Sequence, residues 1–338
     1  MLAALAVVLL GVPQPPSPVS APTPEPPAVT AEAWVVYDAT SGVRLAGFED
    51  DVPRPMASVT KVMTALVVRD HTQLADRSRI SARAAGVGEA EVGLIPGERW
   101  TIEDLLYAML VRSANDAAMA LAEHVGGSVE QFAVMMNEKA TELGLQNSSF
   151  VNPHGLDDLD HYSSASDLAK LGQELLADPV LAEIVRTRFV VFRPAPDGSL
   201  RAVRNTNRLL GEYPDIAGVK TGFTGRAGRV LISALETPDR LLVAVVMASE
   251  DHFADSRELL DYGRRLVTFQ DRWRTPLLGE EGGAGIASVD AAEQVRLEAV
   301  PELWDGSGPT TAITDTQVGQ QIEAQLRSLL PVVLGGSG

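Results

Sequence analysis

Apolar residues at 33–48 and again between 189 and 248 form alternating or continuous runs that predict β-strands. Residues 33–48 predict two strands joined at Ser41-Gly42, which is a hairpin signal. Residues 229–236 and 240–248 are strongly apolar and predict two further strands joined by a short polar turn. Residues 189–204 are also β-like, with a turn between Pro194 and Gly198.

Between these strand regions the apolar positions recur at helical spacing. Residues 101–104 have the form of a capping box before an apolar stripe, and three more helices are predicted at 129–143, 165–176 and 180–186. Residues 101–186 are therefore predicted to be a mainly helical lobe. Strands on both sides of this lobe predict an α/β fold, in which distant parts of the chain form one sheet. A last amphipathic helix is predicted at 255–273.

The N-terminal pattern predicts export. The apolar run at 2–12 is too short to span a membrane but has the length of a signal-peptide core, although no cationic segment precedes it. Small residues at 19–21 place the predicted cleavage there, so that residues 1–21 are a predicted signal peptide. Residues 22–32 continue a proline-rich stretch and predict an extended linker. We therefore expect a periplasmic or extracellular protein at the cell wall.

The remaining chain divides into a predicted catalytic domain at 33–273 and an acidic C-terminal extension at 274–338 that we expect to be loosely ordered. A weak helical pattern at 317–330 has no basic face, which argues against membrane attachment through this end.

Composition excludes several classes of function. The 338-residue chain has 28 Lys and Arg against 45 Asp and Glu, a formal charge of −17, which argues against nucleic acid as a partner. It contains no cysteine, so disulfides and thiolate chemistry are excluded. The five histidines show no metal-binding spacing, and we expect no metal and no cofactor; His154 is expected to lock a loop.

The first candidate for chemistry is Ser58 with Lys61, at the start of an apolar helical run. A spacing of three places both on one helix face. A serine hydroxyl needs a base to act as a nucleophile, and a lysine amine is that base only when apolar burial or another cation lowers its pKa. The alternative is a helix-capping serine beside a surface lysine.

Two further patterns supply partners. Ser113 and Asn115 lie two apart at a predicted break between helices, where the hydroxyl can relay a proton to a leaving amine and the amide can hold the lysine and the substrate. A Ser-x-Asn pattern is more often a cap or turn.

The third pattern, Lys220-Thr221-Gly222, precedes the most apolar strands. On an edge strand, Lys220 and Thr221 can bind a substrate carboxylate, and Gly222 lets a peptide lie close. The N–H groups of Phe223 and Ser58 are the predicted oxyanion donors. The alternative is a turn before a buried strand, with a solvated lysine.

In this order, the three patterns match the set found in penicillin-binding proteins and serine β-lactamases. The chain resembles the low-molecular-mass penicillin-binding proteins, the D-alanyl-D-alanine carboxypeptidases. The blocks MASVTKVMTALV, NPHGLDDLDHYSSASDLAKL and GVKTGFTGRAG also resemble that family, over about 34–273. The resemblance implies an antiparallel five-stranded sheet flanked by helices, an inserted helical lobe and a cleft between them.

The resemblance also implies roles for single residues. It makes Ser58 the acylated serine, Lys61 its base, and Ser113 with Asn115 the second catalytic motif. The third motif covers Lys220, Thr221 and Gly222, with Thr224 just beyond. The implied substrates are peptidoglycan stem peptides, and β-lactam antibiotics would acylate the same serine.

Alternatives remain open at this stage. A class A-like β-lactamase needs a further glutamate, for which Glu174 is the nearest candidate, although the expected asparagine does not follow it. A DD-endopeptidase would use the same residues, and a catalytically inactive wall-binding module is a third possibility. Two departures stand out: Arg229 occupies a position that is often aromatic in the family, and too few residues follow for the C-terminal β-domain of many members.

Overall fold

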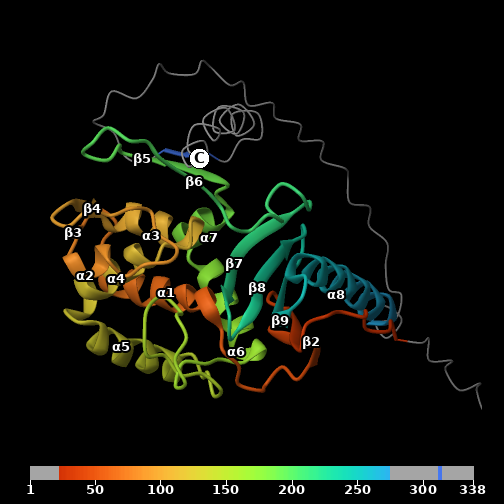
Figure 1. Ribbon diagram of the computed structural model, residues 1–338. Coiled ribbons are helices and arrows are strands. Elements are labelled where there is room, and N and C mark those ends of the chain that lie inside the picture. Colours follow the sequence, from red (N-terminus) through yellow and green to blue (C-terminus); the bar gives the residue numbers. More distant parts are fainter. Residues whose placement is uncertain (1–22, 275–310, 314–338) are drawn as a thin grey trace, which may run out of the picture.

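The computed structural model describes residues 23–274 and 311–313, and its centre is a five-stranded antiparallel sheet with the order β2-β1-β9-β8-β7 (Figure 1). The strands are β1 (Ala33–Asp38), β2 (Val43–Phe48), β7 (Ile216–Thr224), β8 (Gly228–Glu236) and β9 (Leu241–Ser249). β1 pairs with β9 from Ala33 opposite Met247 to Asp38 opposite Leu242. This pairing confirms the predicted sheet made from distant parts of the chain.

Helices cover both faces of the sheet because its central strands are apolar on both sides. The long helix α8 (His252–Arg274) covers one face, where Leu259 and Leu260 pack in a cluster with Trp34 and Leu231. On the other face, α6 (Ala165–Ala177) comes so close that a Cβ on Gly172 would lie 2.8 Å from the Ile232 side chain. Glycine at this position lets the helix pack directly on β8.

The helical lobe lies on the α6 side of the sheet (Figure 1). Its helices are α3 (Ile102–Val111), α4 (Asn115–Gly126), α5 (Val129–Glu142), α6 and α7 (Pro179–Arg186), together with the short α2 (Ala82–Ala85) and the strands β3 (Arg77–Arg79) and β4 (Arg99–Thr101). The Asp104 N–H donates to Thr101 Oγ1 at 3.0 Å, as expected for the predicted helix cap. The helix α1 (Lys61–His71) joins the lobe to the sheet and is preceded by the 3₁₀ turn η1 (Ala57–Thr60).

A smaller sheet contains β5 (Phe189–Phe192), β6 (Arg201–Arg204) and β10 (Thr311–Ile313). β5 and β6 form the predicted hairpin, and β10 pairs antiparallel with β5. Thus one described piece of the C-terminal extension is a strand. The rest of that extension, and the predicted signal peptide, lie outside the described residues. Within residues 23–274 and 311–313, no helix is both long enough and apolar enough to cross a bilayer.

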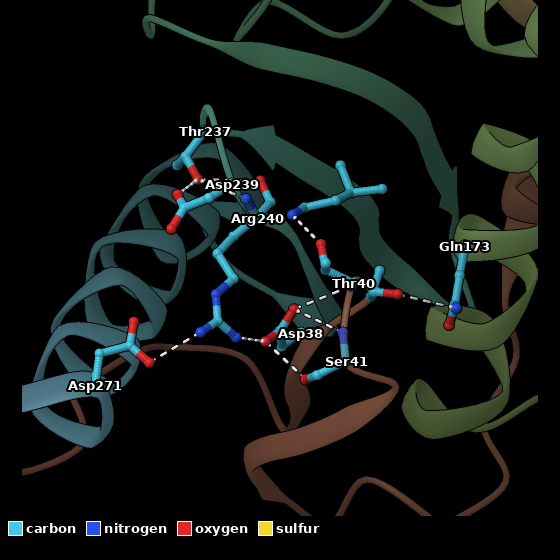
Figure 2. Close-up of polar contacts among 10 residues, drawn as sticks. Asp38, Thr40, Ser41, Gln173, Thr237, Asp239, Arg240 and Asp271 are labelled. Carbon is cyan, nitrogen blue, oxygen red and sulfur yellow. Dashed lines mark hydrogen bonds and ion pairs between the residues drawn. The ribbon is translucent and has the colours of Figure 1, made fainter. Parts of the chain in front are cut away.

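An ion-pair network joins the ends of β1 and β9 to α8 (Figure 2). Arg240 donates to Asp38 at 2.6 Å and to Asp271 at 2.9 Å. Burial of Asp38 favours its neutral form, but hydrogen bonds from Ser41 and Arg240 outweigh this effect and hold its pKa below the ordinary value. The neighbouring strands β1 and β9 are therefore held together at their ends as well as along their length.

Candidate active site

Ser58 and Lys61 lie at the junction between η1 and α1. Ser58 belongs to the 3₁₀ turn and Lys61 is the first residue of the α-helix, so the serine precedes the helix by one turn. Ala57, directly before it, has a φ of 50°, in the left-handed region that non-glycine residues seldom adopt. This bend places the Ser58 Oγ 2.9 Å from the Lys61 Nζ, the pairing that the spacing of three predicts.

The Lys61 amine has two other partners, and both are carbonyl oxygens. Its Nζ lies 2.8 Å from the Asn115 Oδ1 and 2.6 Å from the backbone oxygen of His154. Neither oxygen has a proton to donate. An uncharged Lys61 amine therefore donates its two N–H groups to these carbonyls and keeps its lone pair for the Ser58 hydroxyl. This geometry is suited to a general base.

The surroundings of Lys61 also favour the uncharged form. Its side chain is completely buried. Burial lowers the pKa of Lys61 well below its ordinary value, and the positive charge of Lys220 lowers it further, while Glu89 and Asp116 act in the opposite direction.

Ser113 and Lys220 form the second polar pair of the site. Lys220 Nζ lies 2.9 Å from Ser113 Oγ and 2.8 Å from the Thr221 backbone oxygen, and the side chain is only 1% exposed. Burial lowers the pKa of Lys220 to about 7. Ser113 has a φ of 66°, which turns its side chain out of the α3–α4 connection to meet β7. The structure thus brings the second and third predicted motifs together.

Asn115 is held in one orientation by contacts on both sides of its amide group. Its Oδ1 accepts from Lys61, and its Nδ2 donates to the Gly88 oxygen at 3.1 Å. Its backbone N–H donates to the Ala90 oxygen at 2.6 Å. The next residue, Asp116, is buried and accepts from the backbone N–H groups of residues 92–94. These bonds fix the loop at 88–94 beside the site.

The third motif and the two residues after it lie on β7, at the edge of the sheet, as predicted. A Cβ on Gly222 would lie 3.0 Å from the Ser58 nitrogen, so this glycine allows contact with the chain's own backbone. The Thr221 hydroxyl donates to the Thr206 hydroxyl at 2.7 Å, and the Thr224 hydroxyl donates to Asp157 Oδ1 at 2.7 Å. Phe223 is 63% exposed.

The loop between α5 and α6 supplies groups that sequence reasoning did not identify. Besides the His154 oxygen, it contributes His161, which is 3% exposed. The Val151 N–H donates to His161 Nδ1 at 3.1 Å, so Nε2 carries the proton and donates to Thr60 Oγ1 at 2.7 Å. Thr60 in turn donates to the Ala57 oxygen at 2.8 Å. This chain of hydrogen bonds supports the bend before Ser58.

His154 itself has the predicted loop-locking contact, since the Leu156 N–H donates to its Nδ1 at 3.1 Å. Glu174, the candidate for a lactamase-type glutamate, is exposed on α6, and no hydrogen bond or ion pair links it to a site residue. Among the residues that the structure describes, no group of three or more His, Cys, Asp or Glu side chains is arranged to hold a metal ion.

Comparisons with known proteins agree with this arrangement. Residues 20–251 match the sequence model of the peptidase S11 family, which is described as D-alanyl-D-alanine carboxypeptidase. The chain belongs to the D-alanyl-D-alanine carboxypeptidase family. This confirms the family that the three motifs indicated, and the five-stranded antiparallel sheet with helices confirms the predicted fold class.

Several relatives in this family are similar along most of the described chain. The D-alanyl-D-alanine carboxypeptidase DacF of Bacillus subtilis is 37% identical over 236 residues, which are 68% of this chain and 58% of DacF. DacC of Escherichia coli is 34% identical over 260 residues, 72% of this chain and 63% of DacC. The chain therefore spans less than two thirds of the length of these two relatives.

Solved structures give the same fold. The Streptomyces K15 DD-transpeptidase aligns with a TM-score of 0.67 and 28% identity, covering 71% of this chain and 99% of that one. A penicillin-binding protein homologue from Mycobacterium tuberculosis, Rv2911, aligns with a TM-score of 0.67 and 31% identity, covering 73% and 95%.

Proposed function

We propose that this family member is a serine-type D-Ala-D-Ala carboxypeptidase that removes the terminal D-alanine from peptidoglycan stem peptides. The observation that carries the proposal is the Lys61 amine, buried and held by two carbonyl oxygens with its third position on Ser58. A serine activated in this way attacks carbonyl carbon. The family and its named relatives supply the substrate class.

In the acylation step, Ser58 Oγ bonds to the carbonyl carbon of the penultimate D-Ala, and its proton passes to Lys61. The C–N bond to the terminal D-Ala then breaks, and the leaving amine takes a proton from the Ser113 hydroxyl. Ser113 recovers this proton from Lys220, whose pKa of about 7 makes it an effective donor near neutral pH. The N–H groups of Ser58 and Phe223 are the proposed oxyanion donors.

Deacylation runs these transfers in reverse. A water molecule attacks the ester carbonyl and gives its proton through Ser113 to Lys220, while Lys61 returns its proton to Ser58. The shortened peptide leaves with a new D-Ala carboxylate. β-Lactams, which carry a reactive amide and a carboxylate, are expected to acylate Ser58 in the same way. Because Glu174 is exposed on α6 and outside the site, we expect slow hydrolysis of the penicilloyl enzyme.

Peptidoglycan lies outside the cytoplasm, so the proposed activity requires export. The apolar run and proline-rich segment before residue 33 are consistent with this location. We propose that the protein acts at the cell wall.

The proposal is tested with the Ser58→Ala variant. We expect it to lose all covalent labelling by fluorescent penicillin and all release of D-Ala from diacetyl-Lys-D-Ala-D-Ala, since no other described hydroxyl has this lysine as its base. Its thermal unfolding midpoint should remain close to that of the wild type. The control is Ser199→Ala, an exposed serine in the β5–β6 turn. Labelling that persists in Ser58→Ala would place the nucleophile elsewhere.

A further inference from the structure

The proposed substrate ends in a carboxylate. The lysine of the Lys-Thr-Gly motif does not point toward the place where this carboxylate would bind. Lys220 is buried and its Nζ points inward, to Ser113 Oγ and its neighbour's backbone oxygen. With its pKa lowered to about 7, this amine is only partly charged near neutral pH. Lys220 is therefore placed for proton transfer with Ser113, and the terminal carboxylate needs a second positive group.

The two threonine hydroxyls do not replace that charge. Thr221 donates its proton to Thr206, and Thr224 donates its proton to Asp157, both at 2.7 Å. The oxygen of Thr224 also accepts from the Ala227 N–H at 3.0 Å. Both hydroxyl protons are engaged within the protein, and the acidic side chain of Asp157 beside Thr224 does not favour the approach of a carboxylate.

Arg229 is the cation that the sheet places beside this motif. On β8 it lies directly opposite Phe223 of β7, which puts both side chains on one face of the sheet. Its guanidinium lies 5.7 Å from the centre of the exposed Phe223 ring. Thr221 is the diagonal neighbour, and a diagonal separation of roughly 7–8 Å is within reach of an arginine. An arginine side chain at this position is long enough to turn from the ring toward Thr221.

Arg229 is also free to make this movement. Its side chain is exposed, and its one hydrogen bond is a long contact of 3.3 Å from Nη1 to the Glu250 backbone oxygen. No carboxylate in the described part of the chain forms an ion pair with it. Guanidinium groups bind carboxylates through two parallel hydrogen bonds, a geometry that an ammonium group lacks.

Other positive groups near this end of the sheet are less suited to the role. Arg226 donates to the Asp158 backbone oxygen at 2.8 Å, and Arg208 lies 4.7 Å over the Phe253 ring. His252 is mainly neutral, because burial lowers its pKa to about 4.

From this arrangement we infer that Arg229 is the substrate-binding residue that receives the terminal carboxylate of the peptide, above Thr221 at the open edge of β7. This inference rests on the proposed function and gives Arg229 the carboxylate-binding role that the motif alone assigned to Lys220 and the threonines. The same group would receive the carboxylate of a β-lactam.

The test compares Arg229→Gln, which removes the charge, with Arg229→Lys, which keeps it, and with Arg226→Gln as the matched control. KM and kcat are measured for D-Ala release from diacetyl-Lys-D-Ala-D-Ala, and the C-terminal amide of the same peptide is measured as an inhibitor of that release. We expect Arg229→Gln to raise KM for the acid at least about tenfold, with kcat within about threefold. The inhibition constant of the amide should stay unchanged. Arg229→Lys should recover part of the loss, and Arg226→Gln should behave like the wild type.

An unchanged KM in Arg229→Gln, or equal weakening of the acid and the amide, would overturn the inference. If the wild type is active, such a result for the variant leaves the proposed function intact. A wild type that neither releases D-Ala nor reacts with fluorescent penicillin would instead refute the proposed function, and the inference with it. Because Arg229 is exposed, Arg229→Gln should unfold within a few degrees of the wild type, which separates loss of binding from loss of fold.

Discussion

Lys61 and Lys220 are two buried amines of one site, yet their partners differ. Lys61 faces two carbonyls and a serine hydroxyl, whereas Lys220 faces a serine hydroxyl and one carbonyl. The positive charge of Lys220 and burial both lower the pKa of Lys61, and burial lowers the pKa of Lys220, so the site is expected to hold less than two full charges near neutral pH. This coupling lets one amine accept a proton while the other gives one.

The coupling predicts how a charge change at Lys220 alters the pH profile. In Lys220→Gln the neighbouring positive charge is lost, which raises the pKa of Lys61. A higher pH is then needed to obtain its uncharged form, so the acid limb of penicillin acylation should move to higher pH. The second-order rate constant of acylation, measured across pH for wild type and variant, checks this shift.

Lys170→Gln, which removes a half-exposed lysine on α6, is the control and should leave the limb unchanged. A limb that stays in place or moves to lower pH in Lys220→Gln would contradict the proposed coupling.

The turn η1 and strand β7 meet at Gly222, and this close contact lies directly at Ser58. A methyl group there would lie 3.0 Å from the Ser58 nitrogen and 3.1 Å from the Met56 oxygen, both backbone atoms. Backbone atoms held in a turn and a strand cannot easily move aside. The two elements therefore require glycine at this position, independently of any substrate.

We expect Gly222→Ala to slow penicillin acylation at least about tenfold and to destabilise the fold by about 1–3 kcal/mol, the usual range for overpacking. Gly225→Ala is the matched control, because a methyl group at that position meets no atom within 4 Å. Acylation rates and thermal unfolding of both variants give the comparison. Equal rates in Gly222→Ala and the wild type would show that the turn adapts.

The sequence predicted the elements well, because their signals are local. The capped helix at Thr101, the hairpin at Ser41-Gly42 and the pairing of Ser58 with Lys61 follow from spacing and side-chain type. The His154 backbone oxygen had no signal, since every residue carries one. The hydroxyl bonds of Thr221 and Thr224 depend on loops distant in sequence and were equally hidden.

As a whole, the molecule builds its candidate site from four regions of the chain: the η1–α1 junction, the α3–α4 connection, the α5–α6 loop and the edge strand β7. Every candidate residue, Arg229 included, precedes the last strand of the main sheet, which ends at Ser249. Helix α8 then covers the outer face of that sheet with Leu259, Leu260 and Leu266. Of the region beyond 274, the described strand β10 contacts the small sheet through β5, not the main sheet.

Deleting everything after Pro276 should therefore leave D-Ala release measurable, within about threefold of the full chain. A deletion after Ser249, which also removes α8, should give no soluble enzyme, because the apolar face of the sheet is then exposed. D-Ala release by the two purified truncations makes the distinction. Complete loss of D-Ala release in the protein truncated after Pro276 would show that the extension belongs to the catalytic unit.

The pairing of β1 with β9 has a consequence for the time at which the protein becomes reactive. Besides its neighbour β2, the first strand of the main sheet pairs with β9, more than 200 positions later, and Ser113 pairs with Lys220, which is 107 positions later. We therefore expect Ser58 to become reactive only after nearly the entire domain has been synthesised and has folded. On the proposed function, reaction with penicillin would report completed folding, and a pulse of labelled antibiotic would time that event.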